Sequence, residues 1–247
     1  TTGGSQPGHA SHAPIPPVSD RKDKVKYQES KINRKKFVSG QKNFGLGFNF
    51  CNFNASYRQT LMEATRDIPA EELSALRDPA TRRGAFDRLV GTYLRPLYWH
   101  ARRLVVVHED AEDVVQETFI RAYDKIGTFR GGAGELGAWL YRIATNTALT
   151  MLRRRRPGLF SSLDDVSRIL ASRVAEECGE DADRTLVRFQ QAILELPLKQ
   201  RLVFNLRYYD RMPYGEIARV LGQREETLKV NYHHAVQKLK EKLTREL

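Results

Sequence analysis

The apolar residues between Asp110 and Ile126 recur at three- and four-residue spacing, and this period constrains the fold more than any other feature of the chain. The spacing stacks them on one side of an α-helix, which we expect to face a core. These core-facing residues are Ala111, Val114, Val115, Phe119, Ala122 and Ile126. The other side forms a mostly acidic strip that can dock a basic partner. The strip consists of Glu112, Asp113, Gln116, Glu117 and Ile120.

The helical period also covers most of the chain outside this stretch, so the sequence predicts an all-α fold. A short helix is expected at 69–76 and a long one at about 81–107, where Pro96 should bend or split the helix. Glu109 or Asp110 is expected to cap the next helix, because a carboxylate accepts hydrogen bonds from the free amide groups at a helix start.

The charge of the chain points to a polyanionic partner. Lys and Arg number 41 against 30 Asp and Glu, a formal charge of +11 in 247 residues. Nucleic acid is the first candidate and a membrane surface the second, but no apolar stretch approaches the roughly 20 residues that span a bilayer. Cys51 and Cys178 have no zinc-site spacing, which favours a reducing cytoplasm and a protein without metal or cofactor.

Two segments lack the helical period and are expected to be flexible. Residues 1–61 should be disordered; their basic part is either a nucleic-acid-binding arm or, as charge runs usually are, a solvated tail. Because Met62 is the first methionine and begins amphipathic sequence, we hypothesise that translation starts there. Residues 157–184 carry seven acids against three arginines, which favours a solvated linker.

A glycine-rich loop, expected from Gly127 to Gly137, precedes an aromatic and basic helix at about 135–155. The loop follows no hydrophobic strand and lacks a GK[ST] ending, which disfavours a phosphate-binding P-loop. In the helix, rings can stack on unpaired bases while arginines follow the phosphates. Core packing explains Trp139 as well as base stacking does, because large rings are often buried. Asn146 is therefore the stronger candidate for a contact with nucleic acid. The aromatic residues Trp139 and Tyr141 are interleaved with the polar and basic residues Arg142, Asn146 and the arginines 153–156.

The last 63 residues, 185–247, predict a helix-turn-helix, with a turn closed by Gly222 and a final helix from Glu225 to Leu243. Leu228, Tyr232, Ala235, Leu239 and Leu243 share an arc that must face the domain. The opposite arc can therefore enter a DNA groove, and its N-terminal residues should read the bases. The candidates are Arg224, Thr227, Lys229, Val230, His233 and His234. The histidine pair is no metal site, because adjacent helical residues point about 100° apart.

Several of these sequence segments resemble conserved regions of one protein family. DAEDVVQETFIRAY, FRG and AWLYRIATN match, in order and spacing, the second conserved region of the extracytoplasmic-function sigma factors, the small promoter-recognition subunits of bacterial RNA polymerase. LPLKQRLVFNLRYYD and PYGEIARVLG resemble the fourth conserved region of the same family. The resemblance implies a transcription initiation factor that binds core polymerase, melts the −10 element and binds the −35 element. Family members are often held inactive by an anti-sigma factor.

The resemblance also implies roles for particular residues. The core polymerase would bind Asp113, Gln116, Glu117 and Ile120. Asn146 matches the family's pocket for a flipped base of the non-template strand, and the acidic linker would run through the polymerase cleft. The full set expected at the −10 element is Phe129, Arg130, Trp139, Tyr141, Arg142, Asn146, Thr147 and Leu149. The loop before Trp139 is longer than usual, and Arg224, Asn231 and His234 depart from the family pattern, which leaves the base preferences open.

The sequence therefore predicts two helical domains, region 2 at 62–156 and region 4 at 185–247, joined by the linker 157–184. A stand-alone helix-turn-helix repressor or activator is the alternative, but it leaves the acidic strip and the arginine-aromatic helix unexplained. A nuclease built on His108, Glu109, Glu112 and Asp113 is weaker still, because these residues have no recognised metal spacing. We expect no catalytic activity.

Overall fold

The computed structural model describes residues 68–154, 174 and 184–245, all within one compact unit, Gly47–Leu247. Every regular element in these ranges is a helix, which confirms the all-α prediction. Residues 1–61, Met62 and nearly all of the linker 157–184 lie outside the described residues. The helices are α3 (Ala70–Arg77), α4 (Arg82–Val105), α5 (His108–Lys125), the 3₁₀ turn η1 (Ile126–Thr128), α6 (Ala133–Arg154), α8 (Arg184–Leu194), α9 (Leu198–Tyr208), α10 (Tyr214–Leu221) and α11 (Glu225–Arg245).

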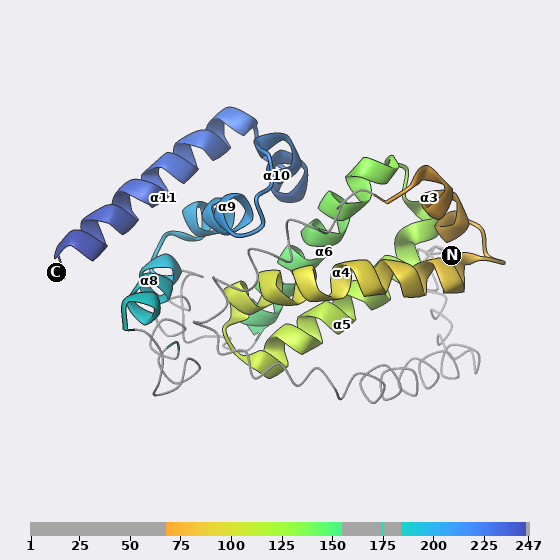
Figure 1. Cartoon of the computed structure of the whole chain (residues 1–247), viewed down its shortest axis with the longest axis horizontal. Coiled ribbons are helices and arrows are strands. Elements are labelled where there is room, and N and C mark those ends of the chain that lie inside the picture. Colours follow the sequence, from red (N-terminus) through yellow and green to blue (C-terminus); the bar gives the residue numbers. More distant parts are fainter. Residues whose placement is uncertain (1–67, 155–173, 175–183, 246–247) are drawn as a thin grey trace, which may run out of the picture. The chain divides into compact units, whose positions relative to one another are not determined.

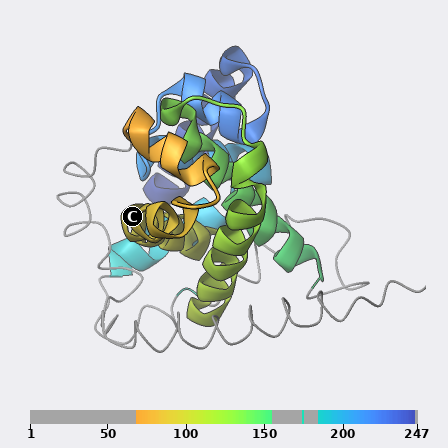
Figure 2. The same cartoon turned by 90° about the vertical axis from the view of Figure 1, so that its right-hand side faces the viewer.

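The first group of helices is built around α4, which packs against both α5 and α6 (Figure 1). Figure 2 views α4 nearly along its axis. The apolar side predicted for α5 is buried throughout, from Ala111 to Ile126, and α5 packs against α4, whose Leu97 and Leu104 are fully buried. The short helix α3 closes one end of this group against α4 and η1.

Pro96 does not split α4, which runs unbroken from Arg82 to Val105. Proline removes one backbone hydrogen bond from a helix interior. Here the apolar residues on either side, Tyr93 and Leu97, are both buried. Their packing against α5 and α6 keeps the helix continuous despite the missing bond.

Two local expectations around α5 and α6 were wrong. Neither Glu109 nor Asp110 caps α5; the helix begins at His108 after Val107, with no side-chain cap, and both acids lie in its first turn, where they still face the positive helix end. The glycine-rich loop is also shorter than expected, because α6 already begins at Ala133. The Glu135 carboxylate accepts a hydrogen bond from the Gly132 amide at 3.0 Å and so satisfies one free donor at the helix start.

The second group contains α8 to α11, in which α11 packs against α8, α9 and α10. Leu228, Ala235 and Leu239 of α11 are buried, as their shared arc predicted. The core is rich in aromatic rings: Phe204 stacks on Tyr208 at 5.1 Å and on Tyr232 at 5.9 Å between ring centroids. Phe204 therefore joins α9 to the final helix.

The turn between α10 and α11 has the geometry that the sequence predicted. Gly222 adopts a left-handed conformation, φ 65° and ψ 35°, and its amide donates to the Ala218 carbonyl at 2.8 Å. Such a residue ends a helix at little cost only when it is glycine. Gly222 thus sets the angle at which α11 leaves α10.

We predict that Gly222→Ala lowers the free energy of unfolding by about 1 kcal/mol, because an L residue is strained in this conformation. Gly91→Ala is the matched control: it lies inside α4, and at both positions an added Cβ meets nothing within 4 Å. The control should instead raise stability by about 0.5–1 kcal/mol, since alanine favours the helix. Urea denaturation measures both; equal effects would exclude the backbone explanation.

Candidate functional site

The acidic strip of α5 lies on the outside of the first helix group. Glu112 and Asp113 are exposed, and Gln116, Glu117 and Ile120 are half-buried. Glu117 is paired with Arg121, one turn later, at 2.8 Å. This pair partly neutralises Glu117, so Asp113 carries more of the net charge that the strip can offer to a basic partner.

On α6 and the loop before it, exposed polar side chains lie beside two partly covered rings. Arg130, Arg142 and Asn146 are exposed. The half-buried rings of Phe129 and Trp139 contact each other at 5.0 Å between centroids, with an interplanar angle of 40°. Rings and cations are therefore both accessible at this end of the molecule, as single-stranded nucleic acid requires.

The loop that carries Phe129 is held in place by α3. Arg77 Nη2 donates to the carbonyl oxygens of Phe129 at 3.2 Å and of Gly131 at 2.8 Å. A Cβ at Gly131 would lie 2.5 Å from the Phe129 ring, so only glycine lets the ring fold back over the loop. No sequence pattern indicates this role of Arg77, because its partners lie more than 50 residues further along the chain.

Three residues expected at the −10 element are not accessible in this arrangement. Tyr141, Thr147 and Leu149 are buried, and the Tyr141 hydroxyl donates to Asp210 at 3.3 Å. Their role in contacting bases stays a prediction. Arg155 and Arg156 lie outside the described residues.

On α11 the outward arc is exposed as predicted. Arg224, Thr227, Lys229, His233 and His234 are all exposed, and Val230 is 53% exposed, an unusual position for a large apolar side chain. The ammonium group of Lys229 lies 5.9 Å from the centre of the Tyr214 ring on α10. The His233 and His234 rings tilt apart, and the described part of the chain holds no cluster of three or more potential metal ligands.

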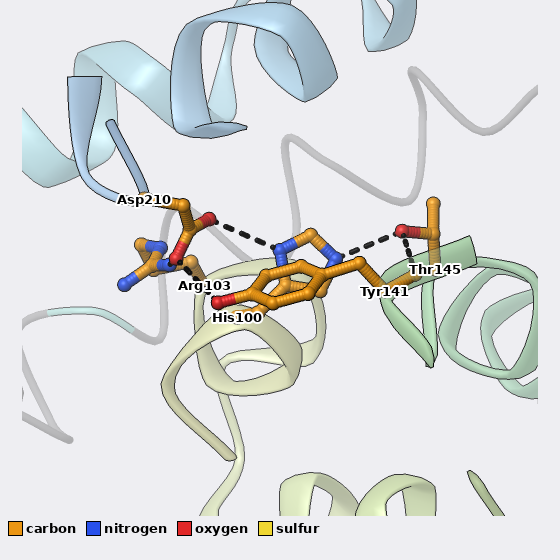
Figure 3. Close-up of polar contacts among 5 residues, drawn as sticks. All are labelled: His100, Arg103, Tyr141, Thr145 and Asp210. Atoms are coloured by element: carbon orange, nitrogen blue, oxygen red, sulfur yellow. Dashed lines mark hydrogen bonds and ion pairs between the residues drawn. The ribbon is translucent and has the colours of Figure 1, made fainter. Parts of the chain in front are cut away.

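A buried polar cluster, which no sequence pattern indicates, links the two helix groups (Figure 3). Asp210, in the turn after α9, accepts a hydrogen bond from Arg103 Nη2 at 2.6 Å, and its other oxygen lies 3.3 Å from His100 Nδ1. His100 Nε2 in turn lies 2.8 Å from the Thr145 hydroxyl of α6. The Asp210 and His100 side chains are fully buried, so a carboxylate and a guanidinium are held together away from water.

Burial dominates the protonation of this cluster. The pKa of His100 lies below its usual 6.5, first because burial penalises the imidazolium and also because Arg103 repels it, while Asp210 opposes both effects. Burial likewise raises the pKa of Tyr209, whose ring lies 4.8 Å from the Arg103 guanidinium. We therefore describe the cluster at neutral pH as a carboxylate–guanidinium pair with a neutral histidine.

Known proteins match both helix groups in this order. Residues 89–157 match the family described as sigma-70 region 2, and residues 186–239 match sigma-70, region 4. The ECF RNA polymerase sigma factor SigW of Bacillus subtilis (strain 168) is 32% identical over 167 residues, which cover 64% of this chain and 89% of SigW. This chain belongs to the ECF sigma factors.

Solved structures of sigma factors resemble this one. CnrH, solved in complex with the cytosolic domain of CnrY, matches with a TM-score of 0.53 and 25% identity over 72% of this chain and 100% of CnrH. The sigma factor RpoE of Bartonella quintana, solved with the anti-sigma factor NepR, matches with a TM-score of 0.50 and 26% identity over 64% of this chain and 96% of RpoE. In this sigma factor α4 to α6 form region 2, α8 to α11 form region 4, and Asp210 joins the two.

Proposed function

We propose that this sigma factor binds core RNA polymerase through α5, opens the −10 element of a promoter with α6, and binds the −35 element with α11. The observation that carries the proposal is the presence of both sigma regions in one chain, each with exposed polar side chains on its outer surface. The formal charge of +11 supports a nucleic-acid partner. The match to both regions disfavours a stand-alone repressor, which needs no region 2.

The acidic strip is suited to a basic surface on the polymerase. The residues of the strip that we assign to this contact are Asp113, Gln116, Glu117 and Ile120, which offer two carboxylates, one amide and one apolar contact on one side of α5. The apolar Ile120 adds area that charge alone does not supply. The opposite side of α5 is buried in the region 2 core, which fixes the orientation of the strip.

The exposed face of α6 is suited to unpaired bases. Asn146 offers both a donor and an acceptor, which can pair with the edge of a flipped base, and Phe129 and Trp139 offer rings for stacking. Arg130 and Arg142 can follow the phosphates. Arg77 keeps the loop and its ring in place from α3.

The N-terminal half of α11 is suited to a major groove. Thr227 and Lys229 can donate to base edges or phosphates, and His233 follows one turn later on the same face. Val230 is an apolar side chain without cover, and such groups contact the methyl group of thymine in DNA complexes. Arg224 lies at the start of the helix, and His234 flanks the face.

The solved relatives suggest a further partner. CnrH was solved with the cytosolic domain of CnrY and RpoE with an anti-sigma factor. We propose that a protein of this class also binds the present chain. None of the helices that the structure describes is long and apolar enough to cross a bilayer. We place the protein in the cytoplasm with its polymerase, and assign it no catalytic step.

Run-off transcription with purified core polymerase tests this function. The template is a fragment selected by its enrichment on the holoenzyme from a library of genomic DNA. A sigma factor gives a transcript with a defined start, whereas a repressor alone gives none. If core polymerase neither binds this chain nor initiates with it, the proposed function is wrong, however tightly α11 binds duplex DNA.

We predict that Asp113→Lys together with Glu117→Lys weakens binding to core polymerase at least tenfold, because two attractive charges become repulsive. Both side chains lie outside the core, so the helical content should not change. Asp87→Lys, an exposed charge reversal on α4, is the control and should leave affinity unchanged. Fluorescence anisotropy of labelled protein titrated with core enzyme measures the affinity; equal affinity in the double variant would remove the strip from the interface.

We predict that Asn146→Ala reduces promoter opening roughly tenfold, because a flipped base would lose its hydrogen-bonding partner. Affinity for core polymerase should stay unchanged. Permanganate reactivity of unpaired thymines measures the opening. Thr150→Val, one turn further along α6, is the control and should open the promoter normally; equal loss in both variants would point to damage of the helix.

A further inference from the structure

An apolar cluster around Trp99 and a buried ion pair together hold region 4 against region 2. Trp99 of α4 is buried in a core cluster whose other buried members, Ile193 and Phe204 among them, all belong to region 4, and the half-buried Tyr98 of α4 packs against the same cluster. Next to it, Asp210 contacts Arg103 of α4. The first helix of the helix-turn-helix, α10, packs along α6. All these contacts lie within the one compact unit.

This contact is incompatible with binding both promoter elements. By their names, the −10 and −35 elements lie about 25 base pairs apart, or roughly 85 Å at about 3.4 Å per base pair. A domain of about 60 residues has a radius of gyration of only about 11 Å. Two domains of about this size in contact span only roughly 60 Å, so as long as Asp210 stays against α4 and α6 the reading residues of α11 cannot lie 85 Å from Asn146 of α6. One duplex cannot then engage both.

We propose that Asp210 is an autoinhibitory latch, which holds this sigma factor closed until polymerase or another partner separates region 4 from region 2. The inhibitory half of this inference rests on the proposed function. The α5 strip stays exposed in the closed arrangement, so polymerase can bind before the latch breaks. The latch also withdraws Tyr141, one of the residues expected to contact the melted strand, by bonding its hydroxyl to Asp210.

The chemistry of the latch allows it to be firm and yet reversible. In the closed state the carboxylate of Asp210 is balanced by Arg103 and accepts further hydrogen bonds. In the open state water solvates both charges, which offsets much of the attraction that is lost between them. Removing only one charge penalises the closed state alone, because the other charge would stay buried and uncompensated. Removing both charges should restore part of the closure.

Fluorescence energy transfer in the full chain tests the latch without polymerase. Donor and acceptor dyes are attached at Glu71→Cys on α3 and Lys238→Cys on α11, both exposed positions, after Cys51→Ser and Cys178→Ser. We expect Asp210→Asn and Arg103→Gln each to raise the ratio of open to closed molecules at least tenfold. Glu195→Gln, which removes a carboxylate paired with Lys242 inside region 4, should leave this ratio unchanged.

The double variant Asp210→Asn with Arg103→Gln decides whether the two residues act through each other. We expect it to be more closed than either single variant, since a neutral pair leaves no buried charge. A ratio equal to the product of the single effects, or no opening in either single variant, would overturn the latch. Circular dichroism at equal concentration confirms that both helix groups remain folded, so an open chain is distinguished from an unfolded one.

The pKa of His100 provides a second measure of whether the two domains separate. The His100 ring faces Asp210 from the turn after α9, Arg103 on its own helix and Tyr141 on α6. If Asp210→Asn opens the latch, His100 returns to water and its pKa rises toward 6.5. If the domains stay closed, loss of the carboxylate lowers the pKa of His100 further, because Asp210 was the group that raised it. Imidazole resonances in an NMR titration distinguish the two; a fall would overturn the proposal.

The sign of the pH effect follows from the same shift. Because the closed state depresses the pKa of His100, closure is favoured above about pH 6.5 and weakens as the pH falls below it. At most one proton is involved, so the ratio of open to closed wild-type molecules should rise by no more than about tenfold per pH unit. An increase in closure on acidification would contradict the latch.

Transcription tests whether the closed state is inhibitory. Run-off assays at limiting sigma factor should give several-fold more transcript with Asp210→Asn than with wild type, and the same amount with Glu195→Gln. Energy transfer that falls without any gain in transcript would overturn the inhibitory role. If no variant supports initiation, the proposed function fails and the inhibitory role fails with it, while the energy-transfer result still decides whether Asp210 joins the two domains.

Discussion

Helix α4 is the element on which the rest of the structure depends, because it contributes to two cores at once. Its apolar side packs between α5 and α6 and builds region 2, while Trp99 is buried among the aromatic rings of region 4. Burying so much apolar surface stabilises an unbroken helix even through Pro96, where one backbone hydrogen bond is lost. The acidic strip, the base-binding face and the region 4 contact all take their positions from this one helix.

The local parts of the fold follow from sequence because their causes are local. The spacing from Ala111 to Ile126 predicts the buried side of α5, and Gly222 predicts the left-handed turn before α11. The outward arc of α11 follows in the same way, since a helix that buries Leu228 and Ala235 must expose Val230. Weaker local signals predicted the helix boundaries less well. A carboxylate near a helix start does not have to cap the helix, as α5 shows. The glycines of the loop also did not prevent α6 from beginning at Ala133.

The buried polar cluster could not be predicted in this way. His100 and Asp210 are 110 residues apart, and no period or turn signal connects them. Arg102 and Arg103 lie in the last turn of α4, where charged side chains are usually solvated, yet both are buried. For the candidate site, sequence identified the exposed residues of α5, α6 and α11, but it did not reveal that Tyr141 is covered or that Arg77 holds the loop, because both facts depend on contacts between distant segments.

Trp99 gives the molecule a reporter of its own state. Its indole belongs to region 2 by sequence, but region 4 provides much of its cover. Any partner that separates the two domains must therefore transfer this indole from an apolar surrounding to water, which moves tryptophan emission to longer wavelengths. The other indole, Trp139, lies against Phe129 within region 2 and keeps its neighbour. Activation of this factor should thus be visible in the colour of its own fluorescence, with no label attached.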